Sequence, residues 1–77
     1  MNNWTEKENK LQKTFTFKTF RDAMAWMIKA SYIIDGMDHH PEWTNVYNTV
    51  RVSLSTHSAG NIVTDKDRKL AEEMDKI

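Results

Sequence analysis

The segment 49–56 alternates apolar and polar side chains along its length. A period of two is typical of a strand with one buried face and one exposed face. Such a strand needs neighbouring strands and a covering layer, because it cannot bury its apolar face alone. The apolar face holds Val50, Val52 and Leu54, and the polar face holds Arg51, Ser53 and Ser55. The chain is therefore expected to contain a sheet that is covered on one side.

Three other segments are predicted to be strands. Residues 4–8 form a short candidate, and 11–17 form a second in which Phe15 and Phe17 share a face. Residues 43–47 form the third, and a tight turn at Asn48 joins it to the strand 49–56. Short connections of this kind favour antiparallel pairing.

The segment 19–35 has the helical period, with Thr19 as its predicted N-cap and Gly36 as the residue that ends it. Trp26 and Ile33 fall beside the main apolar stripe, so we expect them to contact a partner subunit, although they could instead pack under the chain's own loops. The stripe expected to cover the sheet consists of Phe20, Ala23, Met24, Met27, Ile28, Ala30 and Ile34.

A second helix is predicted to begin near Thr64, with Asp67 at the spacing of a capping box. Its expected apolar stripe is Leu70, Ala71, Met74 and Ile77. The order strand, strand, helix, strand, strand, helix predicts one α+β domain over residues 1–77. Its fold is a four-stranded antiparallel sheet with the helices packed on one face.

Length, cysteine content and charge exclude several classes of protein. A chain of 77 residues buries a modest fraction of its surface, so association into oligomers is expected. It has no cysteine, which excludes disulfides and thiolate chemistry. Eleven basic residues balance eleven acidic ones, which argues against direct nucleic-acid binding. The start has no signal-peptide pattern and no apolar run could span a membrane, so we expect a cytoplasmic protein without a membrane partner.

The histidines all lie at the ends of predicted elements. His39 and His40 precede the third strand, and His57 follows the fourth, so a hairpin brings them together. Clustered imidazoles favour acid/base catalysis, because they exchange protons near neutral pH. Three exposed histidines could also meet by chance. Zinc binding is less favoured, because adjacent residues of an extended segment point to opposite sides; no metal site is predicted.

The segment 35–67 contains an acidic residue, three positions, His-His-Pro, five positions, Tyr, nine positions, His, and an Asp after a loop. The residues at these places are Asp35, His39, His40, Pro41, Tyr47, His57 and Asp67. In this pattern the segment resembles the pterin-4a-carbinolamine dehydratases. The resemblance implies a lyase that removes water from a 4a-hydroxytetrahydropterin, without a cofactor. The product is a quinonoid dihydropterin, which a reductase recycles to tetrahydrobiopterin.

The resemblance also implies roles for individual residues. His39 and His57 are expected to transfer protons, in an order that the sequence leaves open, and His40 to orient the pterin. Asp67 is expected to act only as a helix cap. The expected substrate-binding residues are Asp35, Asp38, Pro41, Trp43, Ser55, Thr56 and Ser58, although Trp43 could belong to the core and Asp35 could be a solvated charge.

The resemblance also bears on the N-terminal segment, on assembly and on the alternative functions. Members of the family commonly carry a helix before the residue that matches Trp4, and here it is expected to be lacking. The resemblance implies a homodimer or homotetramer, and the helix 19–35 is its expected contact surface. The alternative functions are a pterin-binding module without catalysis and a protein-interaction module, since animal relatives also act as dimerisation cofactors.

Overall fold

A computed structural model describes residues 3–77. None of the helices in this part of the chain is long and apolar enough to cross a membrane. The segment ahead of Trp4, where a helix was expected to be lacking, falls mostly outside the described residues. The elements in chain order are β1 (Thr5–Lys7), β2 (Lys10–Thr16), α1 (Phe20–Met37), β3 (Glu42–Val46), β4 (Thr49–Leu54), the 3-10 turn η1 (His57–Ala59) and α2 (Asp65–Asp75).

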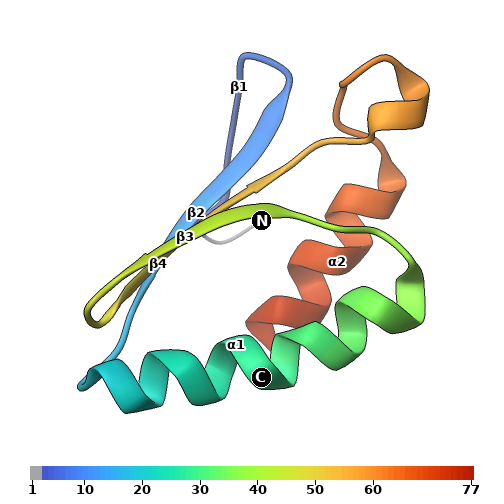
Figure 1. The fold of residues 1–77 in the computed structure, drawn as a ribbon. Helices are drawn as coiled ribbons and strands as arrows, with labels where there is room; N and C mark the ends of the chain where they lie inside the picture. Colours follow the sequence, from blue (N-terminus) through green and yellow to red (C-terminus); the bar gives the residue numbers. More distant parts are fainter. Residues whose placement is uncertain (1–2) are drawn as a thin grey trace.

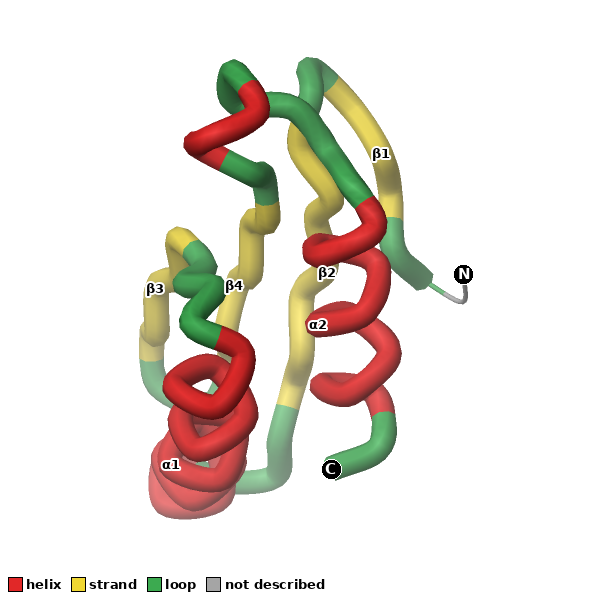
Figure 2. Tube along the Cα trace, turned by 90° about the vertical axis from the view of Figure 1, so that its right-hand side faces the viewer, coloured by secondary structure: helices red, strands yellow, loops and turns green. Residues whose placement is uncertain are grey.

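The four strands form one antiparallel sheet in the order β1-β2-β4-β3. β4 lies inside the sheet, where Leu54 pairs with Leu11 of β2 and Ser53 pairs with Glu42 of β3. Figures 1 and 2 show both helices on the same face of the sheet, which leaves the other face open. The predicted α+β fold is confirmed, and each expected strand is present within two residues of its predicted ends.

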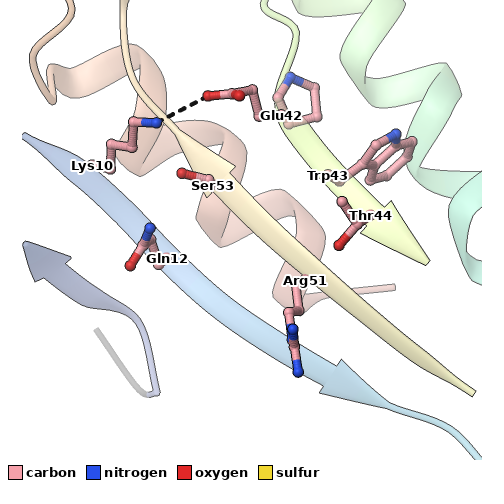
Figure 3. A pocket seen from close by; sticks show the side chains of 8 residues that line it. Lys10, Gln12, Glu42, Trp43, Thr44, Arg51 and Ser53 are labelled. Atoms are coloured by element: carbon pink, nitrogen blue, oxygen red, sulfur yellow. Dashed lines mark hydrogen bonds and ion pairs between the residues drawn. The ribbon is translucent and has the colours of Figure 1, made fainter. Parts of the chain in front are cut away.

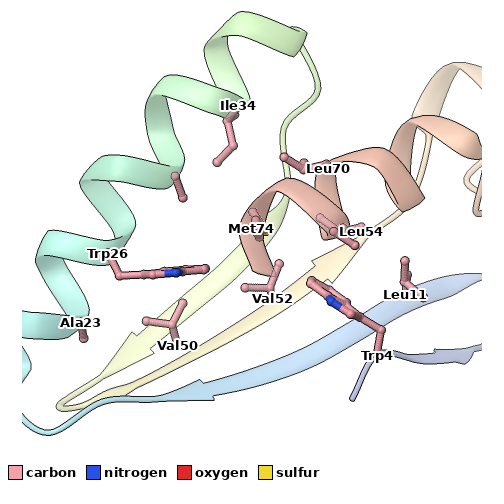
Figure 4. Packing of buried hydrophobic residues seen from close by; sticks show 12 residues of the cluster. Trp4, Leu11, Ala23, Trp26, Ile34, Val50, Val52, Leu54, Leu70 and Met74 are labelled. Carbon is pink, nitrogen blue, oxygen red and sulfur yellow. The ribbon is translucent and has the colours of Figure 1, made fainter. Parts of the chain in front are cut away.

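The core lies between the sheet and the helices (Figure 4). The apolar side chains of β4 are almost fully buried, as their alternation predicts. On α2 the buried face consists of Leu70, Ala71 and Met74. Ile77 was expected to continue this face, but α2 ends at Asp75 and the Ile77 side chain is 39% exposed.

The prediction for the faces of α1 is wrong in its rotation. Trp26, expected at a partner contact, is only 6% exposed and stacks on Phe15, with ring centroids 4.4 Å apart. Ile33 is half-buried against the same core. Apolar residues surround most of this helix, so periodicity alone could not select the buried side. Burying the large indole removes more apolar surface from water than burying a smaller side chain does. The exposed apolar face consists of Phe20, Met24, Ile28 and Tyr32.

The C-terminus of α1 also differs from the prediction. Gly36 was expected to end the helix, but it lies within the last turn and α1 continues to Met37. Asp38 takes the left-handed conformation instead, with φ 50° and ψ 44°, and its backbone N–H bonds to the carbonyl groups of Asp35 and Ile34. Aspartate tolerates this conformation better than most residues other than glycine. The later cap fixes where the chain turns toward His39.

An ionic contact ties the end of α2 to the sheet. Lys13 of β2 places its ammonium 2.6 Å from Asp75, and the indole N–H of Trp4 donates to the same carboxylate at 2.9 Å. The Lys13 ammonium also lies 4.6 Å from the centre of the Phe15 ring. These contacts hold the C-terminal end of α2 against the sheet.

Candidate active site

A hollow of about 320 Å³ lies where β4 ends and α2 begins. The connection from α1 to β3 and the turn η1 approach this end of the sheet from two directions (Figure 1). All three histidines line the hollow, as the hairpin argument predicts. The other lining residues are Asp38, Ser55, Thr56, Ser58 and Lys66.

His39 is buried and held by a carboxylate. Its backbone N–H donates to the Ile34 carbonyl at 3.3 Å, which fixes the chain just after the Asp38 turn. Its Nε2 lies 2.6 Å from Oδ1 of Asp67, a residue that is completely buried. A buried carboxylate needs strong hydrogen-bond donors. The contact therefore orients the His39 ring and also satisfies Asp67.

Asp67 closes a small polar network at the start of α2. Its Oδ2 accepts hydrogen bonds from the Thr64 backbone N–H and from the Thr56 hydroxyl, both at 2.8 Å. The capping box predicted from the sequence is present. The predicted role of Asp67 was limited to this cap, and its contact with His39 could not be read from the capping-box spacing.

His57 has a different anchor. Its Nδ1 lies 2.8 Å from Oδ1 of Asn61, at the other end of the turn that follows β4. That turn is closed by Thr56, whose backbone N–H donates to the Ile62 carbonyl and whose carbonyl accepts from the Asn61 N–H. Asn61 takes a positive φ of 62°, which asparagine tolerates well. The side chain of Asn61 was not among the predicted site residues.

His40 points to a more exposed part of the hollow. Its Nε2 is 3.7 Å from Oδ1 of Asp35, and these side chains are 62% and 85% exposed. An exposed pair of this kind adds little stability. Asp35 does not line the hollow, but the structure places it where it can orient the His40 ring.

The remaining predicted substrate-binding residues divide into two groups. Asp38, Ser55, Thr56 and Ser58 lie at the histidine hollow, although the Thr56 hydroxyl is already engaged by Asp67 and Thr64. Pro41 and Trp43 line a different hollow of about 490 Å³. Its other lining residues come from β2, β3 and β4 (Figure 3). The ring of Trp43 also packs against Trp26, at 6.3 Å between centroids.

Lys66 also lines the hollow, although it was not among the predicted site residues. It follows the N-cap Thr64, where a basic residue has no sequence signal beyond its position. Within residues 3–77, no group of three histidine, aspartate or glutamate side chains is placed to hold one metal ion. The arrangement instead offers two imidazoles, each anchored through one ring nitrogen, beside hydroxyl groups and an ammonium group.

Comparisons with known proteins agree on one family. The family model described as pterin 4 alpha carbinolamine dehydratase matches residues 1–77. A protein from Opitutus terrae is 46% identical over 74 residues, covering 96% of this chain and 76% of the relative. A protein from Bradyrhizobium diazoefficiens is 50% identical over 76 residues, covering 96% and 75%. The names of both relatives assign them to pterin-4-alpha-carbinolamine dehydratase.

Two solved structures resemble the fold. A transcriptional coactivator/pterin dehydratase from Brucella melitensis superposes with a TM-score of 0.93 at 38% identity, over 99% of this chain and 82% of that one. A pterin dehydratase-like protein described as a RuBisCO assembly factor of the alpha-carboxysome gives a TM-score of 0.76 at 19% identity, over 95% and 83%. The second likeness concerns the fold alone.

Proposed function

The chain belongs to the pterin-4a-carbinolamine dehydratase family, and we propose from this that His39 and His57 catalyse the dehydration of a 4a-hydroxytetrahydropterin. One observation carries the proposal. These two histidines are 18 positions apart in the chain, yet both line one hollow, and each is anchored through one ring nitrogen. Each ring therefore has a second nitrogen with which to exchange a proton.

The reaction needs two proton transfers. One group takes the proton from N5 of the pterin, and another protonates the hydroxyl group that leaves C4a as water. The product is a quinonoid dihydropterin. His40, Ser55 and Ser58 are proposed to bind the polar edge of the pterin, with Asp38 and Lys66 as charged neighbours in the same hollow.

The direct test is an absorbance assay of 4a-hydroxytetrahydropterin dehydration, by stopped flow or with a coupled reductase. The purified protein is expected to accelerate the reaction above its spontaneous rate. Treatment with a strong chelator is expected to leave the rate unchanged, because the proposed proton transfers use imidazoles alone. A rate equal to the spontaneous one would refute the dehydratase proposal, and loss of activity with the chelator would refute its metal-free form.

Self-association through α1 is a second part of the proposal. The helix exposes Phe20, Met24, Ile28 and Tyr32 at four-residue spacing, so they form one continuous apolar face. The Ile28 side chain is 57% exposed and that of Tyr32 is 76% exposed. Burying this face against a second copy would remove it from water.

We expect Ile28→Asp to shift the protein toward monomer, because a carboxylate in an apolar interface loses its hydration. The mass in solution, from light scattering after gel filtration, gives the readout. The matched control is Lys29→Asp, which introduces the same side chain at the next exposed position, off the apolar face. An unchanged mass for Ile28→Asp, or an equal change in both variants, would contradict this use of α1.

A further inference from the structure

With Asp67 ionised, the polar network around it has one consistent arrangement of protons. We propose that Asp67, held by Thr56 and Thr64, is a positioning residue that fixes the proton of His39 on Nε2 and so makes His39 the base and His57 the acid. This inference rests on the proposed dehydratase function for the reaction, but the proton positions can be tested without substrate.

The donors around Asp67 fix its orientation. Thr56 has one hydroxyl proton and donates it to Oδ2 of Asp67 at 2.8 Å. Thr64 Oγ1, 2.6 Å from Thr56 Oγ1, must therefore be the donor in that contact. Thr64 Oγ1 accepts from the Lys66 backbone N–H at 3.3 Å, and the Thr64 N–H donates to Oδ2 of Asp67. Each hydroxyl group therefore donates one hydrogen bond and accepts one, and the carboxylate accepts in all of its contacts.

The proton on His39 follows from this arrangement. Oδ1 of Asp67 can only accept, so the contact at 2.6 Å requires a hydrogen on His39 Nε2. A neutral imidazole carries one hydrogen, which leaves Nδ1 with a free lone pair. Among the hydrogen bonds of residues 3–77, Nδ1 of His39 has no partner, and His39 lines the hollow. Neutral His39 can accept a proton from the substrate but cannot donate one through this atom.

His57 is anchored through the opposite nitrogen. Oδ1 of Asn61 accepts from His57 Nδ1–H, so Nε2 is the nitrogen left for the hollow. When His57 is protonated, Nε2 carries a hydrogen that it can donate. Its anchor is a neutral amide, whereas the anchor of His39 is a buried carboxylate that stabilises the positive charge His39 gains on accepting a proton. The two anchors therefore suit opposite roles.

The proposed step moves one proton from the substrate to His39 and one proton from His57 to the leaving oxygen. His39 Nδ1 takes the proton from N5, and the N5–H electron pair forms the N5=C4a double bond. The C4a–O bond breaks with its electron pair on oxygen, and His57 Nε2 donates its proton to that oxygen to release water. His39 ends protonated and His57 neutral, and exchange with solvent restores both.

Asp67→Asn tests the assignment, because two donors converge on Oδ2. The asparagine should place its oxygen there to accept from Thr64 N–H and Thr56 O–H, which turns its NH₂ group toward His39. Nε2 would then have to accept, and the ring proton would move to Nδ1. We expect kcat to fall by roughly 100-fold or more with little change in KM, as expected for an imidazole in the wrong tautomer.

Two-bond ¹H–¹⁵N NMR spectra of the unliganded protein report which nitrogen of each histidine carries the proton. We expect Nε2–H on His39 in the unmodified protein and Nδ1–H in Asp67→Asn. The matched control is Asp65→Asn in the same helical turn, whose carboxylate is fully exposed and contacts Arg68. This control is expected to keep both the activity and the tautomer.

The outcomes separate this inference from the proposed function. Dehydration by the unmodified protein together with Nδ1–H on its His39, or full kcat in Asp67→Asn, would overturn the positioning role and leave the dehydratase intact. No dehydration by the unmodified protein would overturn the proposed function and the acid and base roles with it. The predicted tautomers, the loss of kcat in Asp67→Asn and an unchanged Asp65→Asn control would together support the positioning role of Asp67.

Discussion

Replacing His57 with alanine is expected to slow dehydration of the 4a-hydroxytetrahydropterin by roughly 100-fold or more. Loss of a positioned proton donor typically costs this much. The fold should remain, because His57 is exposed and its side chain makes one exposed hydrogen bond, to Asn61. Two measurements on the same preparation test this prediction. The dehydration rate above the spontaneous one tests the loss of catalysis, and the midpoint of thermal unfolding tests whether the fold remains.

Added imidazole gives this experiment an internal control. A small imidazole can enter the space left by the His57→Ala side chain and supply the missing proton, so part of the rate should return with its concentration. His39→Ala offers a comparison, since its ring is buried beside Asp67 and the variant should lose stability as well as rate. A His57→Ala protein with activity within a few fold of the original would show that the donor is another group.

The position of the histidine cluster follows from hairpin geometry and is therefore readable from the sequence. β3 and β4 are close in length and pair with Glu42 opposite Ser53, so the start of one lies beside the end of the other. His39 and His40 come just before that start, and His57 comes just after that end. Local signals placed each of these boundaries to within two residues, which explains why distant residues could be placed together.

The anchors of the histidines could not be predicted in the same way. Thr64 and Asp67 have the spacing of a capping box, and that local signal is correct. Whether the second oxygen of Asp67 reaches His39 depends on how α2 docks on the sheet, and contacts between distant residues, such as Lys13 with Asp75, determine the docking. A pattern of spacings contains no information on that distance.

The face that α1 buries was mispredicted for a related reason. Ala23, Ala30 and Ile34 were placed correctly in the core, but Trp26 was expected at a partner contact and Phe20 in the core. The helix is apolar over most of its circumference, so its period defines two candidate faces. The aromatic surface formed by β2 and β3 selected the face with the indole, and this selection is a tertiary effect.

Leu54→Ala is expected to have the largest effect on stability. Leu54 is 1% exposed, lies opposite Leu11 in the sheet, and packs beneath α2 near Leu70 (Figure 4). Truncating a buried leucine typically costs about 2–5 kcal/mol in unfolding free energy. Native domains are stable by only about 0.05–0.15 kcal/mol per residue, so this change removes a large part of the total.

The expected readout is a fall in the thermal midpoint of about 10 °C or more, since about 1 kcal/mol corresponds to about 4–8 °C in a domain of this size. Val46→Ala is the matched control: it is also a truncated apolar strand residue, but its side chain is 72% exposed, so its midpoint should move little. Because Leu54 directly precedes Ser55 and Thr56, unfolding of Leu54→Ala should abolish activity at the same temperature at which the core melts. Activity that outlasts the core, or equal midpoints for the two variants, would show that the hollow is not held in place by this packing.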